Sequence, residues 1–186
     1  MNHIGTKELV TDRLLLRKIR SEDDRDMFEQ WASDLQVTRY LTWSAHQSIE
    51  DTRRIIEMWL KDIHELNVYR WVIELKSISK VIGTIDLVNV DSRNQCGTFG
   101  YCLSANYWNQ GIASEALKAM LAYLFSEGDF HRIEASHLIE NGASGRVMIK
   151  CGMIQEGVRR KKFLGHDGKF HDLVIYGILK DEFLIK

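Results

Sequence analysis

The sequence has no proline, only three cysteines and no long apolar segment among its 186 residues. An odd number of cysteines argues against a disulfide framework, so we expect reduced, mostly buried thiols of the kind found in cytoplasmic proteins. No segment approaches the roughly 20 apolar residues that a membrane helix needs. We therefore expect a cytoplasmic protein without a membrane partner, whereas the missing proline points to no particular function.

The chain also lacks an excess of charge of either sign. It carries 25 basic and 26 acidic residues, which gives a net charge of −1. A nucleic-acid-binding domain usually gathers an excess of basic residues on one face. We therefore expect no nucleic-acid partner. The oligomeric state has no signature in the sequence, and a homodimer is one of the assemblies that it allows.

Apolar periodicity predicts strands that alternate with helices in one domain. Two helices are predicted to begin with capping boxes, at Ser21–Asp24 and at Ser48–Asp51. A further helix is expected at 108–127, with positions 117, 120, 121, 124 and 125 as its core face, and another at 144–151, for which Asn141 is the candidate N-cap. The expected strands cover 14–19, 69–75, 81–90, 98–103, 132–138, 153–164 and 173–179. This order predicts an α/β (α+β) fold in which a mixed, mostly antiparallel central sheet carries helices on both faces.

The segment at 107–117 is the most informative part of the chain. It begins as a loop and ends as a helix, with Gly111 and Ala113 at the turn. A helix N-terminus that no bulky side chain covers offers free N–H groups and the positive end of the helix dipole. A pyrophosphate could bind there without a basic side chain in the loop.

Three motifs in order resemble the GNAT family of N-acetyltransferases, and specifically its RimJ/RimL-like branch. Gly111 and Ala113 match the last two positions of the family's Gln/Arg-x-x-Gly-x-Gly/Ala loop, with Trp108 at the usual Gln/Arg position. Asn141-x-x-Ser144, followed by Lys150-x-Gly152, resembles a second family segment. The opening stretch at 11–17, Thr-Asp-Arg-Leu-Leu-Leu-Arg, is a third match. The resemblance covers the chain from about residue 9 to about residue 183.

The resemblance implies acetyl-CoA as co-substrate and a V-shaped splay in the sheet that receives the pantetheine arm. His166 and His171 flank the last turn with no Cys or further His at ligand spacing, so we expect a solvated hairpin and no metal there. The backbone N–H of Leu103 would polarise the acetyl carbonyl. Ser144 is the candidate for a general acid or positioning hydroxyl near the thioester sulfur, or else an ordinary first-turn helix residue. The expected cofactor-binding residues are Tyr101, Cys102, Leu103, Trp108, Asn109, Gln110, Gly111, Ile112, Ala113, Ser114, Asn141, Ser144 and Lys150.

The acid and base positions depart from the family pattern. Many relatives carry a Tyr four residues after the Ser, where this chain has Met148, and a Glu two residues before the strand glycine, where it has Thr98. Three other acidic residues could face the cleft, namely Asp86, Glu74 and Asp172. A site with no obvious base favours amines of low pKa, because an α-amine (pKa about 7.7–8.0) is neutral far more often at pH 7 than lysine (about 10.4).

Three hypotheses for the function stay open at this point. The first is acetylation of a protein N-terminal α-amine by direct attack on the thioester. The second is acetylation of a small amine such as a polyamine, an amino acid or an antibiotic. The third is a catalytically silent module that binds acyl-CoA. The acceptor cleft is expected to be formed by residues 31–63 and by the last hairpin. The first of these segments contains four aromatic residues, Trp31, Tyr40, Trp43 and Trp59. The basic run at 159–162 in the hairpin is expected to be solvated.

Overall fold

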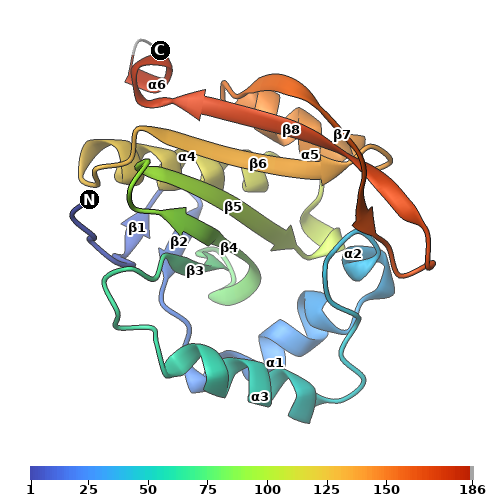
Figure 1. Cartoon of the computed structure of the whole chain (residues 1–186). Coiled ribbons are helices and arrows are strands. Elements are labelled where there is room, and N and C mark those ends of the chain that lie inside the picture. The colour runs from blue at the N-terminus through green and yellow to red at the C-terminus, as the bar shows by residue number, and fades with distance from the viewer. Residues whose placement is uncertain (185–186) are drawn as a thin grey trace.

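One eight-stranded sheet runs through the computed structural model, which describes residues 1–184 (Figure 1). The strand order is β1-β2-β3-β4-β5-β6-β8-β7. Strands β5 and β6 run parallel, and the other neighbouring strands in residues 1–184 are antiparallel. The strands are β1 (Leu9–Val10), β2 (Leu14–Arg17), β3 (Arg70–Leu75), β4 (Lys80–Asp91), β5 (Cys96–Leu103), β6 (Arg132–Leu138), β7 (Ile154–Leu164) and β8 (Phe170–Leu179).

Helices cover both faces of this sheet, as predicted. The α-helices are α1 (Asp24–Met27), α2 (Leu35–Thr38), α3 (Ile49–Leu60), α4 (Ile112–Ser126), α5 (Gly142–Lys150) and α6 (Lys180–Leu184). Shorter turns are 3-10 helices at Ser21–Asp23 and Ala105–Tyr107 and a π-helix at Phe28–Ala32. In Figure 1, α1 and α3 lie on one side of the sheet, and α4 lies on the other. No helix in residues 1–184 is both long and apolar enough to cross a membrane.

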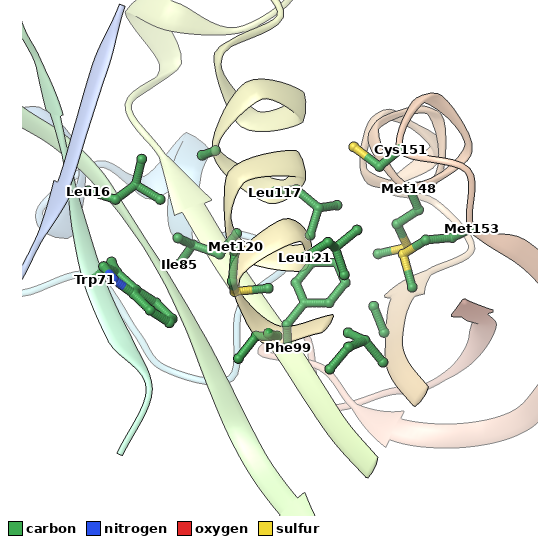
Figure 2. Close-up of a cluster of buried hydrophobic side chains, with 14 of the residues drawn as sticks. Leu16, Trp71, Ile85, Phe99, Leu117, Met120, Leu121, Met148, Cys151 and Met153 are labelled. Carbon is green, nitrogen blue, oxygen red and sulfur yellow. The ribbon is translucent and has the colours of Figure 1, made fainter. Parts of the chain in front are cut away.

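The larger of the two cores lies between the sheet and α4. The predicted core face of this helix is completely buried, and Figure 2 shows its side chains packed against Phe99 and Trp71 from the strands and Met148 and Met153 from the α5 region. A second core beneath α1 and α3 contains Trp31, Ile56 and Cys102. The core face of α4 consists of Leu117, Met120, Leu121, Leu124 and Phe125.

One predicted helix start is confirmed by the structure, and the starts near residue 21 and at residue 108 differ from it. The N–H of Ser48 donates to the Asp51 carboxylate at 3.0 Å, which confirms that capping box. The box predicted at Ser21 is wrong by one residue, because the carboxylate of Asp23 accepts the N–H of Arg20 at 2.7 Å. Helix α4 begins at Ile112 rather than at 108, because the preceding loop contains left-handed residues that a helix cannot include.

The pairing of β5 with β6 is short, and its end divides the sheet. Only Cys96–Thr98 pairs with Arg132–Glu134. Beyond this point the two strands separate, so 99–103 lies beside no strand on that side. The V-shaped splay implied by the family resemblance is therefore present.

A buried ion-pair cluster ties the start of the sheet to the helices beneath it. The guanidinium of Arg17 donates to both carboxylate oxygens of Asp23 at 2.8 Å and, through Nε, to Glu74 at 2.7 Å. The side chain of Arg17 is only 7% exposed. A buried charge without its partner costs several kcal/mol, so each member depends on the others.

Replacing Arg17 by Met should destabilise the fold strongly, because it leaves two carboxylates without their cation. We expect the free energy of unfolding to fall by about 3–5 kcal/mol in urea denaturation. Arg53→Met is the matched control, because it breaks an exposed ion pair with Asp24 and should change stability far less. Equal effects of the two substitutions would contradict the role of the cluster.

Candidate active site

A cavity of about 690 Å³ occupies the gap between β5 and β6. It extends to both faces of the sheet, since its lining includes α4 and α5 residues from one side and α2 residues from the other. Every cofactor-binding residue predicted from the sequence lines the cavity except Gln110. Four further residues of the lining come from the range expected to form the acceptor cleft, namely Gln36, Val37, Tyr40 and Leu41. The residues of the lining that were not predicted are Tyr107, Glu140, Gly142, Ala143, Arg146, Val147 and Ile149.

The end of β5 presents main-chain groups to this cavity. The N–H of Ser104 donates to Ile82 at 2.8 Å, and Leu103 lies opposite Gly83. Since residues of an antiparallel pair alternate between facing the partner and facing away, Tyr101 and Leu103 direct their N–H and C=O groups into the splay. The main-chain groups of Cys102 point toward β4 instead.

The loop before α4 has an uncapped helix N-terminus. Asn109 and Gly111 have φ of 60° and 78°, in the left-handed region. Gly111 is the N-cap residue and has no side chain to cap the helix. Within residues 1–184, no acceptor takes the backbone N–H groups of 111–114. The arrangement provides several convergent N–H donors at the positive end of a helix, which suits a phosphate group.

Trp108 and Gln110 have structural contacts in the same loop. The indole Nε1 of Trp108 donates to the carbonyl of Leu103 at 2.8 Å, so it joins the loop to the end of β5. The carbonyl of Gln110 accepts Nη1 of Arg13 at 2.9 Å, and its side chain donates to Asn106. Gln110 is therefore an exposed loop residue and does not line the cavity.

Helix α5 supplies the opposite wall of the cavity. Its N-cap is Asn141, as predicted, and Gly152 follows its end with φ of 88°. The hydroxyl of Tyr101 donates to Oγ of Ser144 at 3.2 Å, which bridges β5 and α5 across the splay. Burial raises the pKa of the Tyr101 phenol, so this hydroxyl stays protonated. Met148, at the family's Tyr position, is buried in the core.

Helix α5 carries two cationic residues, of which only one was predicted from the sequence to bind the cofactor. Lys150 was predicted and Arg146 was not, although both line the cavity. The two residues are four apart in a helix and therefore lie on one face, and this spacing could have revealed Arg146. The basic run at 159–162 is exposed and does not line the cavity.

Of the three acidic candidates, two are occupied by structural contacts. Glu74 accepts Nε of Arg17, and Asp172 accepts the N–H of Lys161 at 2.7 Å. Asp86 lies opposite Gly100, and its carboxylate makes no hydrogen bond within residues 1–184. Burial raises the pKa of Asp86 to about 6, so its conjugate base can accept a proton near neutral pH.

The buried thiols are unsuited to nucleophilic attack. Cys102 contacts Oγ1 of Thr84 at 3.2 Å, and Cys151 donates to the carbonyl of Ser114 at 3.4 Å. Burial raises the pKa of each thiol to about 11. Because the thiolate is the nucleophile, neither cysteine favours an acyl-enzyme route.

The β7–β8 hairpin reaches the α2 side of the cavity. The Nε2 of His166 donates to the carbonyl of Leu41 at 3.0 Å, and Leu41 lines the cavity. His171 contacts Glu140 and Asp167 at 3.0 Å each, and these carboxylates raise its pKa. The hairpin predicted as simply solvated is therefore attached at both sides of the cavity.

The aromatic residues expected in the acceptor cleft separate into two groups. Tyr40 lines the cavity. Trp31 is completely buried, Trp59 packs beneath the Arg70 guanidinium, and Trp43 packs beside His46. These three tryptophans therefore pack in the α1–α3 layer and do not line the cavity.

Comparison with known proteins agrees with this geometry. The family model described as an acetyltransferase (GNAT) domain matches residues 13–154. The N-acetyltransferase YoaA of Bacillus subtilis (strain 168) is 33% identical over 172 residues, which cover 92% of this chain and 96% of that protein. The ribosomal-protein-serine acetyltransferase of Escherichia coli (strain K12) is 26% identical over 136 residues, or 73% of this chain and 74% of that protein.

A solved structure leads to the same assignment. The GNAT-family acetyltransferase from Bacillus anthracis superposes with a TM-score of 0.82 at 29% identity, over 94% of this chain and 99% of that chain. The chain therefore belongs to the GNAT acetyltransferase family and is an acetyl-CoA-dependent N-acetyltransferase. The similarity to the RimJ/RimL-like branch, predicted from three motifs, is confirmed at modest identity.

A branched side chain at Gly111 should displace the cofactor loop, because its Cβ would already contact Nη2 of Arg13, at 3.5 Å. Gly111→Val puts a β-branched residue at a left-handed φ of 78°, directly before the open N–H groups. We expect the affinity for acetyl-CoA in titration calorimetry to fall at least about 100-fold, because about 3 kcal/mol is lost when several convergent donors are displaced.

Gly168→Val is the matched control for backbone strain. Gly168 has a similar φ of 74°, and a side chain there would meet nothing within 4 Å. This variant should retain the wild-type affinity for acetyl-CoA. Equal affinity losses in both variants would show that strain, rather than the loop, controls binding.

Proposed function

We propose that this N-acetyltransferase acetylates the α-amine of a peptide or protein N-terminus. The observation that carries the proposal is the charge of the cavity. Its lining contains one carboxylate, Glu140, and two cations, Arg146 and Lys150. Glu140 is already paired with His171. A polyamine or aminoglycoside would bring several positive charges to a cavity that has no unpaired carboxylate to receive them.

The α2 end of the cavity supports an acceptor with a single neutral amine. Gln36, Val37, Tyr40 and Leu41 line this end, and none carries a charge at neutral pH. An uncharged lining favours the neutral form of a bound amine, because desolvation disfavours the charged form. An α-amine reaches its neutral form at a much lower pH than a lysine side chain. The ribosomal-protein acceptor in the name of the Escherichia coli relative is consistent with this class.

The donor side of the proposal assigns three groups of residues. The N–H groups of 109–114 would bind the pyrophosphate, with Arg146 and Lys150 supplying positive charge nearby. The inward-facing main chain of Tyr101 would hold the pantetheine arm as an added strand holds a sheet edge. The N–H of Leu103 would donate to the carbonyl oxygen as negative charge develops, a contribution of about 3 kcal/mol in comparable sites.

Ser144 is the proposed proton donor to the leaving thiolate. The amine nitrogen forms a bond to the carbonyl carbon, the carbon–sulfur bond breaks, and the sulfur takes the hydroxyl proton of Ser144. Because the Tyr101 hydroxyl donates to Oγ of Ser144, the proton of Ser144 is directed away from the tyrosine. Water would restore the proton of Ser144 after the thiol leaves, while Tyr101 keeps its own proton and stabilises Oγ of Ser144 by hydrogen bonding. A phenol thus stands beside the acid although Met148 replaces the family's Tyr.

Asp86 is the proposed general base. It does not itself line the cavity, so it would act through water. It lies on the α1–α3 face of β4, two residues from Thr84, which contacts Cys102 in the cavity wall. Gly100 lies opposite it, and a Cβ at that position would stand 3.9 Å from a carboxylate oxygen of Asp86. Of the three acidic candidates, Asp86 alone lacks a structural partner among residues 1–184. A pKa of about 6 suits proton acceptance from an α-amine.

The acceptor class can be tested by measuring thiol release from acetyl-CoA with a matched panel. The panel contains a peptide with a free α-amine and no lysine, its Nα-blocked form carrying one lysine, spermine and an aminoglycoside. We expect the first peptide to give a kcat/KM at least about 100-fold above that of the lysine peptide at pH 7, since the neutral fraction of its amine is more than 100-fold larger. It should also exceed spermine and the aminoglycoside, because the cavity lining offers no unpaired carboxylate to their additional charges.

The outcomes separate the hypotheses. Fastest turnover with spermine or the aminoglycoside would replace the proposal with a small-molecule acetyltransferase. Acetyl-CoA binding without turnover on any acceptor would support the silent binding module. Turnover that Gly111→Val does not reduce would contradict the assigned cofactor loop.

The pH dependence of kcat/KM should show whether Asp86 acts as the general base. Below the pKa of the acceptor, log kcat/KM rises with slope 1 as the amine deprotonates. Below about pH 6 the slope should become 2, because Asp86, whose pKa is about 6, must also be deprotonated. Asp86→Asn should lower kcat/KM about 100-fold and leave slope 1 throughout.

Two further variants act as controls for this profile. Asp91→Asn removes a carboxylate at the far end of the same strand, where it binds Asn94, and should keep both slopes. Ser144→Ala should lower kcat while keeping the slope of 2, since the acid is distinct from the base. A slope of 2 that survives in Asp86→Asn would exclude Asp86 as the base.

A further inference from the structure

Glu115 lies at an electrostatically unfavourable place for this enzyme. It stands in the first turn of α4, immediately after the N–H groups of 111–114. A carboxylate there stabilises the isolated helix, because it faces the positive end of the dipole. The same charge repels a bound pyrophosphate. A helix that must bind an anion therefore needs Glu115 to be neutralised.

The segment before β2 provides this neutralisation. Arg13 donates to Glu115 through Nε at 2.7 Å, forms an ion pair through Nη2 at 2.6 Å and donates its backbone N–H at 3.0 Å. The hydroxyl of Thr11 donates to the same carboxylate at 2.6 Å. Burial raises the pKa of Glu115, but these hydrogen bonds outweigh it, so the pKa lies below its usual value.

Arg13 also contacts the loop itself. Its Nη1 donates to the carbonyl of Gln110 at 2.9 Å. Its Nη2 lies 3.5 Å from the point where a Cβ of Gly111 would stand. One guanidinium therefore joins the helix, through Glu115, to the two loop residues that precede it. The left-handed conformation of Gly111 is fixed from behind, while its N–H stays open toward the cavity.

We propose that Arg13 is a positioning residue for acetyl-CoA: together with Thr11 it holds the pyrophosphate loop in its binding conformation and cancels the charge of Glu115. The inference rests on the proposed binding of the pyrophosphate by 109–114. Arg13 acts through the loop and does not itself need to touch the cofactor. The opening motif of the chain thus serves a site that lies about 100 residues further along.

The test compares two acetyl donors that differ in the pyrophosphate. Acetyl-CoA carries it, whereas S-acetylpantetheine has the same thioester and arm but lacks both the pyrophosphate and the 3′-phosphoadenosine attached to it. For Arg13→Gln we expect the ratio of kcat/KM with acetyl-CoA to kcat/KM with S-acetylpantetheine to fall about 10-fold or more, as the loss of hydrogen bonds between charged groups predicts. The loss should appear in the KM for acetyl-CoA rather than in kcat.

A second substitution separates charge from packing. Glu115→Gln removes the charge and should lower the acetyl-CoA affinity less than Arg13→Gln does. The double variant Arg13→Gln/Glu115→Gln should bind more tightly than Arg13→Gln alone, because no unpaired carboxylate faces the pyrophosphate. Lys7→Gln is the matched control, since it breaks the ion pair with Glu127 at the other end of α4 and should leave the donor ratio unchanged.

The results distinguish two kinds of failure. If Gly111→Val weakens acetyl-CoA binding but Arg13→Gln leaves the donor ratio at the wild-type value, the positioning role is wrong and the loop assignment stands. Equal losses with both donors, or a double variant that binds no better than Arg13→Gln, would likewise reject the role. If Gly111→Val binds acetyl-CoA normally, the loop assignment itself fails.

Discussion

The separation of β5 from β6 after three paired residues is the constraint on which the rest of the site depends. Parallel neighbours normally continue to share hydrogen bonds along their length. Here pairing ends at Thr98 and Glu134, which leaves the N–H and C=O of Tyr101 and the N–H of Leu103 without a strand partner, whereas the Leu103 carbonyl accepts Nε1 of Trp108. Unsatisfied N–H and C=O groups at a buried position are costly, so a ligand that satisfies them gains affinity.

Three contacts keep this opening from collapsing or widening. Tyr101 reaches Ser144 across it, Trp108 joins the loop to the end of β5, and Arg13 holds the loop from behind. The first contact crosses the gap from β5 to α5, and the other two hold the loop that follows β5 in the chain. The cavity is thus shaped before a ligand enters, which reduces the ordering cost of binding.

The sequence predicted most of the elements but little of their connectivity. The strand at 132–138 and the core face of α4 followed from apolar periodicity, which depends only on neighbouring residues. The start of α4 was predicted four residues early, because the apolar ring of Trp108 resembles a helix position although it packs against β5. Roles that depend on distant partners were invisible, since nothing near Glu74 in the sequence indicates its pairing with Arg17, nor near Glu115 its pairing with Arg13.

The two ends of the cavity come from different parts of the chain and from different cores. The proposed donor end is lined by residues between 101 and 150, whereas the proposed acceptor end takes residues of α2, which packs with the second core. On this proposal, substitutions at Tyr40 or Leu41 alter the acceptor without disturbing the surface assigned to acetyl-CoA. In such an architecture, duplicated genes can diverge toward new amines while they inherit one donor site unchanged.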